Sequence, residues 1–122
     1  MIGLELAISV ASIALRGEPT GYARVFNADV VAVAKSHLRA GTILDGEGGA
    51  TIYGGLRPAH TSIEQGYLPL GLANHAKLKT DIAPDQIITF GDVEIDKTSK
   101  AFAMRRATQS LLDAPPLVWL AP

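Results

Sequence analysis

The stretch Lys35-Ser36-His37-Leu38-Arg39-Ala40-Gly41-Thr42-Ile43-Leu44 recurs in physical type 44 residues later, as Lys79-Thr80-Asp81-Ile82-Ala83-Pro84-Asp85-Gln86-Ile87-Ile88. Each block has a basic residue, a hydroxyl, a polar residue, one aliphatic residue, a three-residue turn, a polar residue and two aliphatic residues. Gly41 and Asp85 occupy the same turn position, and both residue types tolerate the left-handed backbone of a tight turn. We therefore expect two similar strand–turn–strand corners, packed against each other around a pseudo-symmetric core.

Around these blocks, the segment 21–96 consists of brief apolar runs separated by turn residues. Two of the runs, Ala76-Lys77-Leu78-Lys79 and Val93-Glu94-Ile95-Asp96, alternate apolar and polar residues, which is typical of half-buried strands. The turns leave no room for crossover helices, which argues against a parallel βαβ sheet. The sequence therefore predicts a compact, mainly β domain over 21–96.

The first segment, Ile2–Leu15, is almost wholly apolar and is predicted to be a helix that ends at Gly17. Its polar residues are spaced four, three and four apart and form a single stripe: Glu5, Ser9, Ser12 and Arg16. The run is too short to cross a bilayer, and an acidic residue stands where a signal peptide carries positive charge. A helix apolar on most sides needs more cover than one neighbour gives, so we expect 1–17 to pack against a preceding domain or in an oligomer.

The other end, 97–113, is predicted to be a surface helix followed by a tail, 114–122. Asp96, Thr98 and Ser99 offer an acidic, capping start. Its expected apolar face is Phe102, Ala103, Ala107, Leu111 and Leu112. Trp119 in the tail either packs back on a protein surface or belongs to a dangling terminus.

The charge balance and the absence of cysteine exclude several classes of function. The chain has 122 residues, with 11 Lys+Arg against 12 Asp+Glu, so it lacks the basic surface that nucleic acids or anionic membranes attract. The absence of Cys removes disulfides, thiolate metal sites and cysteine nucleophiles. With no signal or membrane segment, we expect a cytoplasmic protein.

Motifs for catalysis or cofactor binding are weak. Gly46-Glu47-Gly48-Gly49-Ala50-Thr51 misses the third glycine of a dinucleotide fingerprint, and its acidic residues would repel a pyrophosphate. The three histidines have no ligand spacing, and no serine lies in a nucleophile elbow. We expect neither a catalytic set nor a bound cofactor or metal within these residues.

One polar patch is dense enough to consider for binding a polyol or a sugar acid. Its candidate residues are Arg57, His60, Asn74, His75, Lys77 and Lys79. The alternative interpretation is a solvated sheet face, which is the more common origin of such a patch.

The two repeated blocks, with Ala34 and Leu78 before them and Gly91-Asp92-Val93 after the second, resemble the SAF domain. That domain has the β-clip fold and occurs in antifreeze-type proteins and sialic acid synthases. The resemblance implies a β-clip-like core of short strands, with an apolar helix before it and a surface helix after it.

A closer resemblance covers nearly the whole chain. It is carried by Ile2-Gly3-Leu4-Glu5-Leu6, Leu15-Arg16-Gly17-Glu18-Pro19-Thr20-Gly21, Asp45-Gly46-Glu47-Gly48-Gly49 and Leu68-Pro69-Leu70-Gly71-Leu72-Ala73. These segments are similar to the C-terminal region of homoserine-dehydrogenase-like NAD(P)-dependent oxidoreductases, a group that includes deoxyxylulose-phosphate-reductoisomerase-like enzymes. There a Rossmann domain and a catalytic domain come first, so the resemblance implies that the chain is a fragment.

The resemblance implies a non-catalytic accessory domain that covers the catalytic domain or the subunit interface. The parent would transfer hydride between NAD(P)H and a small aldehyde, ketone or semialdehyde, with NAD(P) bound outside this chain. Its partners would be the parent's Rossmann and catalytic domains, or a second copy through Ile2–Leu15. Two alternatives remain: a stand-alone SAF module that binds carbohydrate or sugar acids, and a secreted assembly chaperone of the flagellar type. The uncovered helix disfavours the first, and the missing signal segment disfavours the second.

Overall fold

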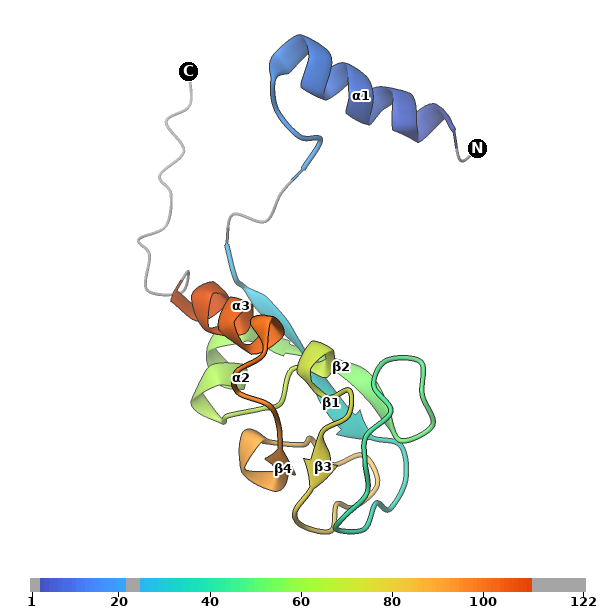
Figure 1. The fold of residues 1–122 in the computed structure, drawn as a ribbon, viewed down its shortest axis with the longest axis vertical. Helices are drawn as coiled ribbons and strands as arrows, with labels where there is room; N and C mark the ends of the chain where they lie inside the picture. Colours follow the sequence, from blue (N-terminus) through green and yellow to red (C-terminus); the bar gives the residue numbers. More distant parts are fainter. Residues whose placement is uncertain (1–2, 22–24, 111–122) are drawn as a thin grey trace.

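The computed structural model describes residues 3–21 and 25–110, in which three helices accompany two small antiparallel sheets (Figure 1). The elements in chain order are α1 (Leu4–Arg16), β1 (Ala28–Ala34), β2 (Ile52–Pro58), α2 (Ala59–Glu64), the 3-10 turn η1 (Leu70–Leu72), β3 (Lys77–Leu78), the 3-10 turn η2 (Phe90–Asp92), β4 (Val93–Glu94) and α3 (Lys100–Gln109). β1 pairs with β2, and β3 pairs with β4.

The predicted fold class, mainly β, does not account for the helices of the structure. Helix accounts for 33% and strand for 24% of the residues that the structure describes, so the architecture is mixed. The helix α2 was not predicted, because it is only six residues long and its N-cap, Pro58, makes no side-chain capping bond. Its existence depends on packing against β1 and β2 rather than on local signals.

The two repeated corners pair with each other, as predicted. The Leu38 N–H donates to the Ile82 carbonyl at 2.9 Å, and the Ile82 N–H donates back to Leu38 at 2.8 Å. These residues are equivalent in the repeat, so the reciprocal bonds lie on the pseudo-two-fold axis. Both side chains are buried in the core.

Hydrogen bonds on either side of this axis come in matched pairs. The Gly41 N–H donates to Leu78 at 2.8 Å, and the equivalent Asp85 N–H donates to Ala34 at 2.9 Å. Both turn residues have left-handed backbones, with φ of 88° at Gly41 and 61° at Asp85. The same geometry therefore forms at a glycine and at an aspartate, the two residue types that tolerate it most easily.

A single aliphatic core fills the space between the corners. Its fully buried large residues are Leu44, Ile52, Leu68, Leu78, Ile82 and Ile88. Leu44 and Ile88 are again equivalent in the repeat, and each donates its N–H to a residue before the other corner, Ala76 and Ala32 respectively. Truncating one of these residues to Ala would remove about 2–5 kcal/mol of stability.

The predicted alternating strands at 76–79 and 93–96 are present in part, as the two-residue strands β3 and β4. They are antiparallel, with Lys77 opposite Glu94 and Leu78 opposite Val93. Leu78 and Val93 are buried while Lys77 and Glu94 are exposed, which is the expected result of period-two alternation.

The predicted C-terminal helix is present as α3, and Ser99 caps it by accepting the Phe102 N–H at 3.2 Å. The expected apolar face was partly wrong, because Ala103 and Ala107 are exposed. The half-buried residues include Phe102 and Arg105 instead, since Arg105 is drawn inward by a buried carboxylate described below. The predicted positions Leu111, Leu112 and Trp119, with the tail 114–122, lie outside the described residues.

Candidate functional site

The six polar residues expected to bind a ligand fall into two groups. Arg57 lies one residue before the end of β2 and donates to the adjacent Leu56 carbonyl at 2.7 Å. His60 lies in α2, with its Nε2 3.2 Å from the hydroxyl of the neighbouring Thr61. The other four follow one another along the segment through β3: Asn74, His75, Lys77 and Lys79. No hydrogen bond or ion pair between described residues joins the two groups.

Asn74 and His75 line a hollow beside the start of α3. Its volume is about 250 Å³. The remaining walls are Gly71, Leu72, Ala76, Ile95, Asp96, Ser99 and Ala101. His75 has a left-handed backbone, with φ of 63°, and donates its N–H to Leu44 at 2.9 Å. The turn is thus anchored directly to the core.

Two polar residues that line this hollow, Asp96 and Ser99, already form hydrogen bonds at the start of α3. Asp96 accepts hydrogen bonds from the Thr98 N–H at 2.8 Å and from the Thr98 hydroxyl at 2.6 Å. Both bonds lower the pKa of Asp96, and the bond from the hydroxyl has the larger effect. Ser99 is the N-cap. Between described residues, neither the Asn74 amide nor the His75 imidazole forms a hydrogen bond, so both can meet a hydroxyl or carboxylate ligand, which suits binding better than catalysis.

The glycine-rich loop 45–51 folds around its own carboxylate. Asp45 accepts the Ala50 N–H at 2.5 Å, the Thr51 N–H at 3.1 Å and the Thr51 hydroxyl. These bonds, led by the one from the hydroxyl, lower the pKa of Asp45. A nucleotide-binding loop offers its N–H groups to phosphate, whereas here an aspartate already uses them. The loop residues therefore do not fit a dinucleotide.

A buried ionic cluster joins α3 to the sheet, and sequence analysis did not find it. Arg105 donates to Asp29 through two nitrogens, at 2.9 and 2.6 Å, and Ser62 donates to the same carboxylate at 2.5 Å. The guanidinium also lies 4.9 Å from the centre of the Phe26 ring. Asp29 is only 6% exposed, so these charge-assisted hydrogen bonds are shielded from water. They connect β1, which carries Asp29, to α2 through Ser62 and to α3 through Arg105. The one signal in the sequence is an aspartate directly before the apolar run 30–34.

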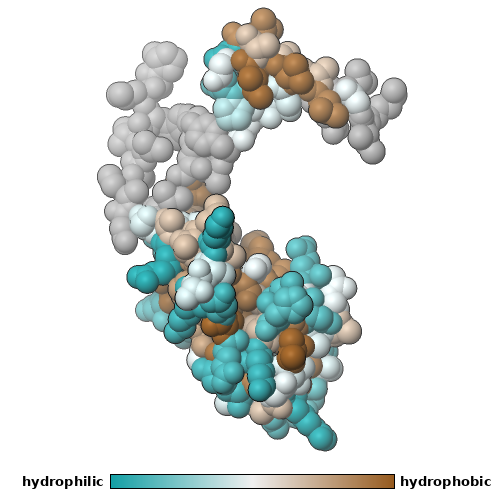
Figure 2. All heavy atoms as spheres, viewed as in Figure 1, coloured by the Kyte–Doolittle hydropathy of each residue, from teal (hydrophilic) through white to brown (hydrophobic). Residues whose placement is uncertain are grey.

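The most unusual surface belongs to α1, whose large aliphatic side chains point into solvent. Figure 2 shows hydrophobic residues along this helix. Leu6, Ile8, Val10, Ile13 and Leu15 are between 62% and 85% exposed. The predicted uncovered helix is therefore present, although Ile2 lies outside the described residues.

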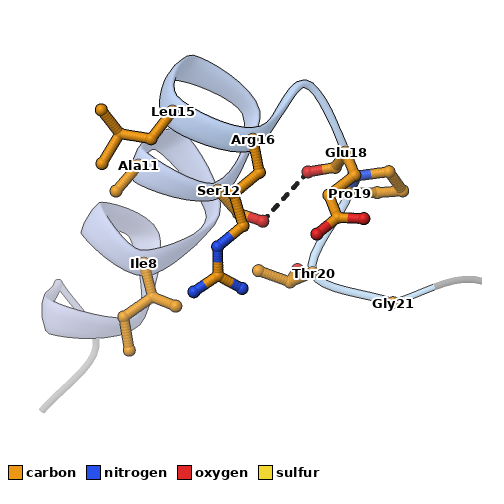
Figure 3. Close-up of a pocket in the computed structure, with 9 residues that line it drawn as sticks. All are labelled: Ile8, Ala11, Ser12, Leu15, Arg16, Glu18, Pro19, Thr20 and Gly21. Atoms are coloured by element: carbon orange, nitrogen blue, oxygen red, sulfur yellow. Dashed lines mark hydrogen bonds between the residues drawn. The ribbon is translucent and has the colours of Figure 1, made fainter. Parts of the chain in front are cut away.

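The segment after α1 folds back along the polar side of the helix (Figure 3). Ser12 donates to the Glu18 carbonyl at 3.0 Å, and the Ser9 and Thr20 hydroxyls lie 3.4 Å apart. The resulting hollow, of about 660 Å³, is open and bordered by Ile8 and Leu15, while Arg16 extends into it. Ser9 and Ser12 of the polar stripe thus find partners within the segment, whereas the described aliphatic side chains remain exposed.

Neither a metal centre nor a membrane-spanning helix is found in the described part of the chain. Within 3–21 and 25–110, no three His, Asp or Glu side chains are placed to share a metal ion. None of the helices there has the length and apolar character needed to cross a bilayer.

Comparison with known proteins finds no match for this chain, either among protein-family models or among curated proteins.

Proposed function

We propose that this chain is a non-catalytic accessory domain that attaches to another protein surface through α1. The observation that carries the proposal is the exposed aliphatic surface of a helix that contributes nothing to the buried core. An amphipathic helix gains most of its stability from burying its apolar side, so a helix left uncovered in its own domain requires an external cover.

The core supports this assignment because it is complete without α1. Its buried residues all lie between Ala32 and Val93, and the two corners close it through reciprocal bonds. Among residues 6–16 of α1, whose burial is described, Ser12 alone is buried, and it is covered by the segment that follows the helix.

We further propose that the domain is a SAF domain of the β-clip type, from an NAD(P)-dependent oxidoreductase of the homoserine-dehydrogenase-like group. The residues that carry the SAF resemblance are those that form the paired corners, which supports the assignment. The nicotinamide would be held by the parent's other domains, because the loop around Asp45 does not fit a nucleotide. The role of this chain is then to cover the catalytic domain or the subunit interface.

The docking role is tested by Ile8→Lys. We expect this variant to be more soluble than the parent chain and to keep its cooperative thermal unfolding, because Ile8 is 64% exposed and outside the core. Met104→Lys, at an equally exposed position on α3, is the control and should change neither property. Loss of cooperative unfolding in Ile8→Lys alone would assign α1 to the domain's own core and overturn the proposal.

The link to an oxidoreductase is tested by sequencing the genomic locus upstream of the Met1 codon. An in-frame reading frame with a strand–GxGxxG–helix segment would support a dinucleotide-binding parent. A stop codon and a ribosome-binding site directly upstream would contradict a covalent parent.

A second candidate function, binding of a carbohydrate or sugar acid, is favoured by the hollow at Asn74 and His75. Titration with gluconate, followed by amide chemical shifts, tests it. Shifts confined to residues 71–76 and 95–101, and lost in Asn74→Ala, would support this function. Unchanged spectra at millimolar gluconate would exclude this ligand.

A further inference from the structure

The strand β2 forms an open edge of its sheet. Its neighbour β1 bonds to other segments through Ala32, which donates to the Leu68 carbonyl at 2.8 Å and accepts from the Ile88 N–H at 2.9 Å. Gly54 lies opposite Ala32 in the register, so the N–H and the carbonyl of Gly54 point away from β1. No described residue outside β1 forms a hydrogen bond with them.

Two further residues of β2 direct their backbone groups away from β1. Ile52 lies opposite Ala34, which donates its N–H to the Gln86 carbonyl at 3.0 Å. Because the direction of the backbone groups alternates along a strand, those of Leu56 also point outward. Among the described residues, only the Leu56 carbonyl has a partner, the Arg57 guanidinium at 2.7 Å. The edge therefore presents an outward N–H and carbonyl at every second residue: Ile52, Gly54 and Leu56.

This edge is accessible to another strand. An edge strand pairs readily unless side chains or an irregular backbone block it. The seven residues of β2 run in continuous register with β1 without a bulge, and Gly54 and Gly55 leave the centre of the strand free of side chains. On either side of them, Tyr53 is 40% exposed and Leu56 is 67% exposed. The strand β2 is therefore a template for a second strand, and it ends at Pro58, which has no N–H.

We propose that this edge pairs with β2 of a second copy of the chain, antiparallel about a two-fold axis at Gly54. The outward groups then meet in register, because Gly54 lies opposite Gly54 of the second copy and Ile52 lies opposite Leu56. Each such pair exchanges two hydrogen bonds, so the two sheets join into one. The inference goes beyond the docking role of α1, since no residue of that helix takes part.

The position of the axis follows from the ends of the strand. An axis one residue before Gly54 would pair Leu56 with Ala50, whose N–H is already bonded within its own loop. An axis one residue after Gly54 would pair Ile52 with Pro58, which has no N–H to donate. The axis at Gly54 is therefore the register in which every outward group finds a partner.

The side chains that meet across this axis are complementary, which favours a second copy over an unrelated strand. Tyr53 falls opposite Gly55 of the second copy, so each aromatic ring covers a residue without a side chain. Arg57 falls opposite Thr51, whose hydroxyl is hydrogen-bonded to the Asp45 carboxylate. The hydrogen bonds that lower the pKa of Asp45 keep this carboxylate charged. A cation therefore meets an anion on both sides of the axis.

Two substitutions in β2 test the contact by its dissociation constant, measured by sedimentation. Leu56→Pro removes an outward N–H but no bond to β1, and proline is tolerated on an edge strand where its nitrogen faces solvent. We expect the constant to rise roughly tenfold or more, with unchanged thermal unfolding at low concentration. Leu56→Ala keeps the N–H and is the matched control, with a smaller expected rise. Arg57→Glu keeps every N–H but places like charges together, and we expect the constant to rise roughly tenfold as well. Equal effects of Leu56→Pro and Leu56→Ala, or an unchanged constant in Arg57→Glu, would overturn the proposed register.

Hydrogen exchange along β2 of the natural chain separates this inference from the proposed function. Between about 5 and about 500 µM, we expect the outward amides of Ile52, Gly54 and Leu56 to become roughly tenfold slower to exchange. The inward amides of Tyr53 and Gly55, which bond to β1, are the internal control and should be equally protected throughout. Slower exchange of α1 instead would overturn the β2 contact and leave α1 as the docking helix. A chain that keeps the mass of one copy by light scattering at the higher concentration would also overturn the contact.

Discussion

The two terminal helices have opposite relations between composition and attachment. α1 is mostly aliphatic, yet its large side chains are exposed and its hydrogen bonds reach only as far as Thr20. Half of the residues of α3 are polar, yet the helix is held by an ion pair between Arg105 and Asp29 and by Phe102 against Phe90, whose rings meet edge to face at 6.2 Å. The hydropathy of a helix therefore indicates how much apolar surface it needs to bury. Specific side-chain contacts, such as an ion pair, determine which surface it packs against.

This contrast gives the two helices different roles. α3 belongs to the domain, because a buried ion pair with good geometry is costly to break from one side. We propose that α1 belongs to an interface, because its exposed apolar surface exceeds what the described residues of its own chain cover.

The largest expected effect comes from releasing α3. Arg105→Ala leaves the Asp29 carboxylate buried without its partner, so we expect the free energy of unfolding in urea to fall by about 3–5 kcal/mol. Arg106→Ala, one residue along on the exposed side, is the matched control and should stay within about 0.5 kcal/mol. Equal losses in both variants would show that α3 is not held by the ion pair.

A smaller loss of stability is expected from replacing an apolar residue of α3, compared with an apolar residue of α1. Phe102→Ala removes a half-buried ring and its contact with Phe90, and we expect a loss of about 1–3 kcal/mol in the same urea measurement. Ile13→Ala on α1 should cost less than about 0.5 kcal/mol under monomeric conditions, because the side chain is already in water. A reversed order would contradict the assignment of the two helices.

Capping gives a third comparison. Ser99→Ala removes the side-chain cap of α3 and should lower the free energy of unfolding by about 1 kcal/mol. The N-cap of α1 is Gly3, which has no side chain to cap the helix, so Gly3→Ser should raise helix content by circular dichroism. The unfolding midpoint of Gly3→Ser should not change, and an increase would mean that α1 unfolds together with the core.

The smallest effect is pH dependence at the start of α3. The bonds from Thr98 lower the pKa of Asp96 from its ordinary 3.8, so their contribution is present above that value. It is lost as the pH falls through the lowered pKa of the folded state. The Thr98 amide shift should follow this titration, and in Asp96→Asn it should not; a titration retained in that variant would assign it to another group.

The sequence predicts the corners well because their determinants are local. Turn residues with left-handed backbones at Gly41 and Asp85, followed by paired aliphatics, define the same geometry twice. The Asp29–Arg105 pair has no such local signal because its members are 76 residues apart, and α2 has none because it forms by packing. Of the candidate ligand residues, only Asn74 and His75 share a hollow, since the side of each strand or turn they occupy depends on tertiary pairing.

The central claim, that α1 docks externally while α3 belongs to the core, is tested most directly by amide hydrogen exchange of the natural chain at low concentration. Under these monomeric conditions we predict that amides in Leu4–Arg16 exchange through local opening, at the rates of an isolated helix. Amides in Lys100–Gln109 should be far more protected. Protection of α1 equal to that of β1 in the monomer would contradict the account.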